Sequence, residues 1–222
     1  GQGWQTPEIW DKAAGRPNAE EFRKMEVILD ELRERKIMVY PFAGFIGKVS
    51  HYPETGTEQE RYVRYTMSRL SSYWNIVYAP ASPEPNVGEP DWLPVPVVER
   101  MGRLIQKYNV SGHLVSVHNA TPDTLEGSTI FRDADWTDYV ITQGPKTFDL
   151  AHLSRIHLRN HHPEKPLLAQ ETLWPGNGAH PSYDEINICK NAYVITMAAA
   201  AICFGDMNGN STSGFSGTLD PK

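Results

Sequence analysis

The chain has 222 residues, of which 40% are hydrophobic and 22% are charged, and its formal net charge is −6. This length is enough for one domain with a well-buried core. The acidic balance leaves no Lys/Arg stripe for phosphates, which argues against nucleic acid, and no apolar run reaches the ~18 residues of a membrane span. The chain shows no signal peptide.

Two helix–strand pairs are predicted in the first third of the chain. The first helix opens with a capping box of Asn18 and Glu21, and the second with one of Thr57 and Glu60. The strands that follow are expected from Ile37 to a loop at Gly44, and over 75–79. Apolar side chains recur at helical spacing, at Phe22, Met25, Ile28, Leu29 and Leu32 in the first helix, and at Val63, Met67, Leu70 and Trp74 in the second. The segment before Asn18 offers no convincing pair of strands.

The same alternation continues to the end of the chain. A helix over 97–108 precedes the strand HLVSVHN (113–119), and the strand DYVITQG (138–144) precedes a helix around Leu150, Leu153 and Ile156. The strand in KPLLAQETLWPG (165–176) is followed by a helix opened by a capping box of Ser182 and Glu185 and by a strand over 202–204.

The two cysteines, Cys189 and Cys203, fall in apolar surroundings and are predicted to be small core residues. A disulfide between them is the less favoured alternative, because one lies in the last predicted helix and the other in the next strand.

Strands that alternate with helices pair in parallel through right-handed crossovers. No phosphate-binding glycine fingerprint follows a strand, so a (β/α)8 TIM barrel is favoured over a nucleotide-binding sheet. Six strands are predicted, whereas closure of this barrel takes eight. We therefore expect residues 1–222 to form a single barrel domain from which about two N-terminal βα units are missing.

Glu171 is the leading catalytic candidate. It lies where an apolar strand runs out towards a loop, Trp174 follows closely, and no charge partner is near it in sequence. Barrel enzymes draw their active-site groups from the C-terminal ends of strands, and a carboxylate beside an indole fits attack on a sugar. The structural alternative is a strand-end Glu paired with Arg or Lys.

Four successive segments, HLVSVHN, DADWTDYVITQG, KPLLAQETLWPG and ITMAAAAICFGDMNG, resemble the apiosidase-like members of the TIM-barrel glycoside hydrolases. The likeness covers most of the chain from Asn18 onward, in the order that the family uses for strands three to eight. The resemblance implies an eight-stranded barrel that cleaves glycosidic bonds of an oligo- or polysaccharide with two carboxylates, and it favours a retaining mechanism. It also favours an extracellular or periplasmic location.

The resemblance places the nucleophile on Glu171 and the acid/base at the end of family strand four. That segment reads NIVYAPASPEPN here, so the family's Gly-Gly-Asp is missing, and Glu84 is the nearest carboxylate. Glu89 and Asp91 in the same loop are the reserves. Apart from the resemblance, an exposed carboxylate in a Pro-rich loop is an equally good interpretation of Glu84.

Other strand-end residues are candidates for binding the sugar. Amide, imidazole and carboxylate groups hydrogen-bond hydroxyls, and aromatic faces pack on pyranose rings. For each of them a structural role, such as a loop contact or a packed ring, is the alternative reading. These residues are Tyr78, His118, Asn119, Gln143, Trp174 and Asp206.

Three other functions remain open. A carbohydrate-binding barrel that has lost its acid explains the irregular PASPEPN segment, and a metal-dependent hydrolase would use His118 and Asp206 as ligands. An inert interaction domain leaves the strand-end polar residues without a shared purpose. The histidines at 157, 161 and 162 lie near a helix C-terminus, at the face of a barrel that stabilises, so we expect no metal there. No cofactor is expected.

Overall fold

In the computed structural model, the residues described are 8–39, 46–47, 53, 55–76, 83–84, 94–117, 130–144, 147–173, 184–198 and 200–204. The chain divides into two compact units. The N-terminal unit comprises Gln2–Asn119 and Ala134–Tyr139, and the C-terminal unit comprises Gly1, Ala120–Asp133 and Val140–Lys222. Mixed α/β structure is present in both, as the alternating pattern predicts.

The N-terminal unit contains α1 (Ala19–Glu34), α2 (Gly56–Leu70) and α3 (Val95–Tyr108). Asn18 is the N-cap of α1, as predicted, and its side chain accepts a hydrogen bond from the Glu20 backbone N–H. The predicted capping box is wrong, because the Glu21 carboxylate instead accepts from Lys24 at 2.6 Å. Helix α2 begins earlier than expected, and its capping box is formed by Thr55 and Glu58.

The predicted helix faces are confirmed at their centres and wrong at their margins. Phe22 and Leu29 of α1 are buried, as are Val63, Met67 and Leu70 of α2 and Val98, Met101 and Ile105 of α3. Ile28 is 61% exposed, and Trp74 lies beyond the end of α2 and is 56% exposed. A side chain one step off the central stripe of a helix is buried only where a neighbouring element covers it.

Parallel strand pairing links two segments of the N-terminal unit. Val39 bridges Ile76, and β3 (Ile46–Gly47) pairs with β4 (Pro83–Glu84), with Ile46 opposite Pro83. Both pairs have the same sequence separation of 37 residues, so one register holds at both positions.

Hydrogen bonds extend this order through the next two predicted strands. The His113 ring contacts the Ile76 carbonyl oxygen at 2.9 Å, and the Asp138 backbone N–H donates to the Val115 carbonyl at 2.7 Å. Within this unit, neighbouring segments therefore follow one another in chain order, as in a sheet built from βα units.

The segment before Asn18 corrects one prediction. It forms a short antiparallel pair, β1 (Trp10–Asp11) and β2 (Arg16–Pro17), joined by a turn in which Gly15 has φ +58°. Positive φ is easily adopted by glycine and strained for most other residues. Trp10 packs edge-on against Tyr62 of α2, with ring centroids 6.2 Å apart.

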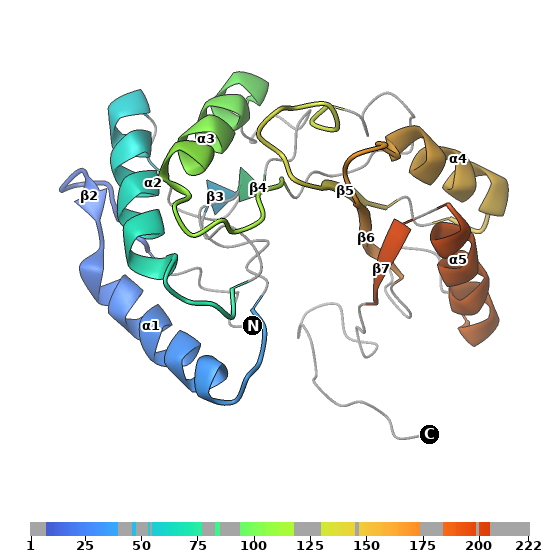
Figure 1. Ribbon diagram of the computed structural model, residues 1–222, viewed down its shortest axis with the longest axis horizontal. Coiled ribbons are helices and arrows are strands. Elements are labelled where there is room, and N and C mark those ends of the chain that lie inside the picture. The colour runs from blue at the N-terminus through green and yellow to red at the C-terminus, as the bar shows by residue number, and fades with distance from the viewer. Residues whose placement is uncertain are drawn as a thin grey trace. The chain divides into compact units, whose positions relative to one another are not determined.

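The C-terminal unit is a parallel sheet covered by helices. Strands β5 (Val140–Gln143), β6 (Leu167–Leu173) and β7 (Ala200–Phe204) lie in that order, beside α4 (Leu150–Asn160) and α5 (Glu185–Met197) (Figure 1). The three predicted strands are thus confirmed. The core between sheet and helices is formed by Val140, Leu153, Leu167, Ala169, Leu173, Ile195 and Ala200.

The start of α5 and the cysteines differ from the predictions. The cap of α5 is Asp184, whose carboxylate accepts from the Asn187 backbone N–H at 2.7 Å, so the predicted box with Glu185 at its third position is wrong. Cys189 and Cys203 are not joined by a disulfide and both are exposed, so neither is a core residue. Across the described residues, no helix has the length and apolarity needed to cross a membrane.

Candidate active site at the strand ends

Glu171 lies at an irregular point of β6. Ala169 pairs with Ile202 and Leu173 pairs with Phe204, so four steps along β6 correspond to two along β7. The backbone of Glu171 belongs to this bulged stretch, near the C-terminal end of the strand. Bulges break the strict alternation of a strand and often lie next to active sites, where they re-aim a side chain.

Gln143 is the last residue of β5, and its backbone is opposite Gln170 in the parallel register. The backbones of two predicted site residues, Gln143 and Glu171, thus lie on adjacent strands at the same end of the sheet. This is the arrangement that the sequence predicts for a site at the strand ends.

Buried polar side chains surround this end of the sheet, and none of them was predicted. Thr142 and Thr172 have no exposed surface, and Gln170 is 4% exposed. The Thr172 hydroxyl donates to the Gln170 carbonyl at 3.2 Å, whereas Thr142 Oγ1 and Gln170 Oε1 have no hydrogen-bond partner in the described part of the chain. Such atoms also occur away from the strand ends, at Thr66, Asn75, His157 and Asn160, so they add polar groups to this end of the sheet without by themselves identifying a site. The signal in the sequence is the switch from apolar to polar residues within each strand.

Glu84 lies in the N-terminal unit, in β4, opposite Gly47 of β3. The sequence predicts that the preceding strand ends at 79 and that Glu84 follows in a loop; the structure instead places its backbone in a strand pair. Its position in a parallel pair, in the same register as Val39 and Ile76, keeps it a strand-end candidate.

The other predicted site residues, Tyr78, His118, Asn119, Trp174 and Asp206, lie outside the described residues, as do Glu89 and Asp91. One described segment ends at Val117 and another at Leu173, so His118 and Trp174 each directly follow a described segment in sequence.

Of the three histidines near the C-terminal end of α4, His157 lies inside the helix. His157 is fully buried, and its Nδ1 donates to the Leu153 carbonyl at 2.8 Å. Burial lowers the pKa of this imidazole, because the charged form is poorly solvated there. Among the described residues, no three His, Cys, Asp or Glu side chains lie close enough together to hold a metal ion.

Comparison with known proteins gives a family and a fold. The family model described as "Apiosidase-like, catalytic domain" matches residues 3–209. None of the curated proteins compared with the chain matches it.

Three solved structures share the fold at low sequence identity. A glycoside hydrolase family 5 protein from Bacteroides vulgatus ATCC 8482 is 14% identical, covers 93% of this chain and has a TM-score of 0.61. A protein titled "Glycoside hydrolase" is 15% identical, with 99% coverage and a TM-score of 0.62. A putative glycoside hydrolase from the same Bacteroides strain is 17% identical, with 94% coverage and a TM-score of 0.63. The chain spans 46%, 53% and 42% of these three chains, about half of each.

Proposed function

Because the chain belongs to the apiosidase-like catalytic domain family, we propose that it is a glycoside hydrolase that cleaves an oligo- or polysaccharide by retention. Glu171 is the nucleophile in this proposal, and Glu84 is the general acid/base. A retaining enzyme needs one ionised carboxylate to attack the anomeric carbon and a second, protonated one to donate to the leaving oxygen.

The observation that carries the proposal is the place of Glu171 in β6. The residue lies in a bulge near the C-terminal end of a parallel strand, next to the end of β5. In barrel enzymes this end of the sheet holds the catalytic groups. The buried Thr142 and Gln170 next to it supply polar atoms that could orient a carboxylate or a sugar hydroxyl.

The remaining parts of the site follow from the same proposal. Gln143, His118 and Asn119 hydrogen-bond sugar hydroxyls, and Asp206 lines the same pocket. Tyr78 and Trp174 contribute aromatic surface for the ring of the substrate. The complete enzyme is an eight-stranded barrel, in which about two further βα units join the strands seen here, and no cofactor takes part. The family resemblance favours an extracellular or periplasmic location.

The test is hydrolysis of a panel of aryl glycosides by the complete protein that contains this chain and by its Glu171→Gln variant. We expect the substitution to lower kcat by about 10³-fold or more, because an amide cannot form the glycosyl–enzyme bond. The matched control is Glu164→Gln, an exposed carboxylate before the N-terminal end of β6, which should keep full activity. Trapping Glu171 with a 2-fluoro glycoside, followed by mass spectrometry of the peptide, checks the covalent step.

A different result would favour a different function. If the chain hydrolyses no glycoside but binds oligosaccharides, it is a carbohydrate-binding barrel that has lost its acid. If Glu171→Gln hydrolyses as fast as the parent, the nucleophile is another residue and the proposal fails.

A further inference from the structure

A cavity lies in the N-terminal unit, beside the turns that lead into two of the predicted strands. It has a volume of about 500 Å³ and is lined by the segment that follows α2, residues 71–76, and by the turn that follows α3, residues 111–114. This volume is within the range of about 300–1,000 Å³ that is usual for small-molecule sites. Both segments precede predicted strands, whereas Glu84 and His118 follow them. Within the N-terminal unit, the cavity is therefore at the opposite end of the predicted strand 75–79 from Glu84.

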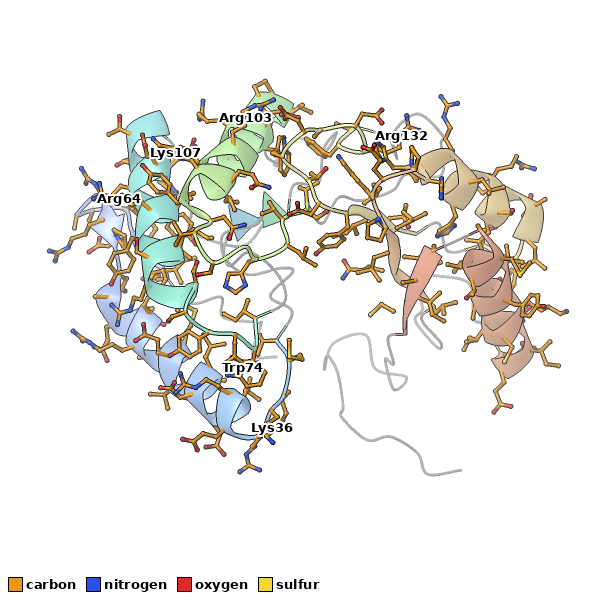
Figure 2. All side chains as sticks on the ribbon, in the orientation of Figure 1. Lys36, Arg64, Trp74, Arg103, Lys107 and Arg132 are labelled. Carbon is orange, nitrogen blue, oxygen red and sulfur yellow. The ribbon has the colours of Figure 1, made fainter. Side chains whose placement is uncertain are left out.

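Trp74 is the aromatic wall of this cavity. Its side chain is 56% exposed, although Tyr73, Asn75 and Ile76 beside it are all buried. Figure 2 shows Trp74 on the segment that leaves the C-terminal end of α2. Tryptophan is highly buried on average. An indole face that is exposed beside a cavity is therefore available to pack against an apolar group of a ligand.

The other wall offers hydroxyl groups and open space. Ser72 and Ser111 are exposed, and at Gly112 an added Cβ would have no heavy atom within 4 Å. Among the described lining residues none is Asp, Glu, Lys or Arg. A ligand matched to this lining is uncharged, has an apolar face for the indole and carries hydroxyl groups for the serines.

His113 holds the two walls together. Its Nδ1 and Nε2 are each 2.9 Å from a backbone carbonyl oxygen, of Ile76 and of Ser71 respectively. The turn between α3 and His113 is fixed by Asn109. Its Nδ2 donates to the His113 carbonyl at 2.6 Å, and its Oδ1 accepts from the His113 N–H at 3.0 Å. A cavity whose walls are already ordered loses little conformational entropy when a ligand binds.

From this geometry we infer that the cavity at Trp74 is a non-catalytic binding site for a neutral glycan, with one sugar ring stacked on the indole. The hydrophobic C–H face of a pyranose packs on an aromatic ring, and its hydroxyls find Ser72 and Ser111. The site holds a polysaccharide chain on the protein and takes no part in bond cleavage.

The inference is tested by native gel electrophoresis in the presence of soluble arabinoxylan, galactomannan or hydroxyethylcellulose. All proteins carry Glu171→Gln, so that the polysaccharide in the gel stays intact. We expect at least one polysaccharide to retard the parent protein. Trp74→Ala and Ser72→Arg, which fills the cavity from an exposed position, should each raise the apparent Kd about fivefold or more. The matched control Tyr193→Ala removes an aromatic ring that is 71% exposed in α5, and it should leave retardation unchanged.

Two outcomes would overturn the inference: retardation of Trp74→Ala equal to that of the parent, or no retardation by any of the three polysaccharides. Circular dichroism of each variant shows whether a loss of binding reflects a loss of fold; if Trp74→Ala is unfolded, Ser72→Arg alone decides. Hydrolysis of aryl glycosides by Trp74→Ala without the Glu171 substitution should match the parent. If no protein hydrolyses glycosides but Trp74 controls retardation, the proposed function fails and this inference stands.

Discussion

Gly102 shows how a single residue allows two segments to pack in the N-terminal unit. A Cβ at this position would lie 2.3 Å from the Trp136 ring, which is 2% exposed. The ring cannot move aside easily, because Trp136 Nε1 donates to Glu99 at 2.8 Å and its carbonyl accepts from Gln106. Glycine in α3 is therefore required by close packing.

We predict that Gly102→Ala lowers the free energy of unfolding by about 1–3 kcal/mol, the usual cost of overpacking. Urea denaturation of the variant and the parent measures this change in the free energy of unfolding. The matched control is Gly56→Ala in α2, where the nearest atom to an added Cβ is Arg100 Nε at 4.0 Å. That variant should be as stable as the parent or slightly more stable, because alanine favours a helix. Equal stability of Gly102→Ala and the parent would show that the Trp136 ring is not fixed in place.

His157 makes the stability of the protein depend on pH. Burial lowers the pKa of its imidazole in the folded state, and the Leu153 carbonyl only partly offsets this effect. The unfolded chain, with a pKa of about 6.5, then binds more protons than the folded one in mildly acidic solution. Stability is therefore full above pH 6.5 and falls as the pH drops below it.

We predict that His157→Phe, which keeps a buried ring without a titrating group, flattens the fall in Tm between about pH 7 and pH 5. The control is His161→Phe, at an exposed position directly after α4, which should keep the slope of the parent. Thermal melts followed by circular dichroism give both curves. An unchanged slope in His157→Phe would mean that other groups cause the acid sensitivity.

At the scale of elements, the start of α2 shows that a capping-box pattern in the sequence does not by itself locate the N-cap. Thr55 Oγ1 accepts from the Glu58 backbone N–H at 3.3 Å, and the Glu58 carboxylate accepts from the Thr55 N–H at 3.4 Å. Thr57 and Glu60 show the same spacing but lie inside the helix. We predict that Thr55→Ala costs about 1 kcal/mol of stability. Thr57→Ala, the same substitution two residues on, should cost nothing, and equal losses in the two variants would refute the assignment of the cap.

Local sequence could not choose between these two caps, because both match the same pattern. A contact outside the pattern favours the earlier start: Gln59 is buried, and its side chain donates to the Pro53 carbonyl at 3.0 Å. The same limit applies to Ile28 and Trp74. Periodicity identifies the centre of an apolar face, whereas its width depends on which elements pack against it.

The strand ends show a similar division between what the sequence predicts and what it does not. The apolar runs in 138–144 and 165–176 predict β5 and β6, and the order of motifs predicts a polar cluster at their ends. The bulge at Glu171 was not predicted, because the register of β6 against β7 depends on pairing between segments far apart in sequence. Gln170 and Thr142 are not among the predicted residues because each directly precedes the candidate on its strand, Glu171 and Gln143 respectively.

At the scale of the whole molecule, six predicted strands account for the order of hydrogen-bonded neighbours within each unit. The strands recur at the spacing of a βα repeat, and this repeat is visible in a single sequence, so the order of neighbours could be predicted. The relation between Glu84 and Glu171 is of another kind, because one belongs to the N-terminal unit and the other to the C-terminal unit. Only chemistry that requires both residues reveals whether they act together.

The last prediction concerns that pairing. If Glu84 is the general acid, Glu84→Gln should slow hydrolysis of alkyl glycosides by about 10²–10⁴-fold, because a poor leaving group requires a proton. Hydrolysis of 2,4-dinitrophenyl glycosides should fall far less in its first step, because that leaving group departs as an anion. Azide, a nucleophile that needs no base, should then rescue the second step and yield glycosyl azide.

The pH profile gives an independent reading of the same residue. A general acid must be protonated, so kcat/KM of the parent for alkyl glycosides should fall on the alkaline side. That fall should disappear in Glu84→Gln, because the titrating group is gone. Glu89→Gln and Asp91→Asn, in the same stretch of sequence, are the controls. If one of them loses the alkaline fall and responds to azide while Glu84→Gln does not, the acid is that residue; if none does, the general acid lies outside this stretch and the role proposed for Glu84 fails.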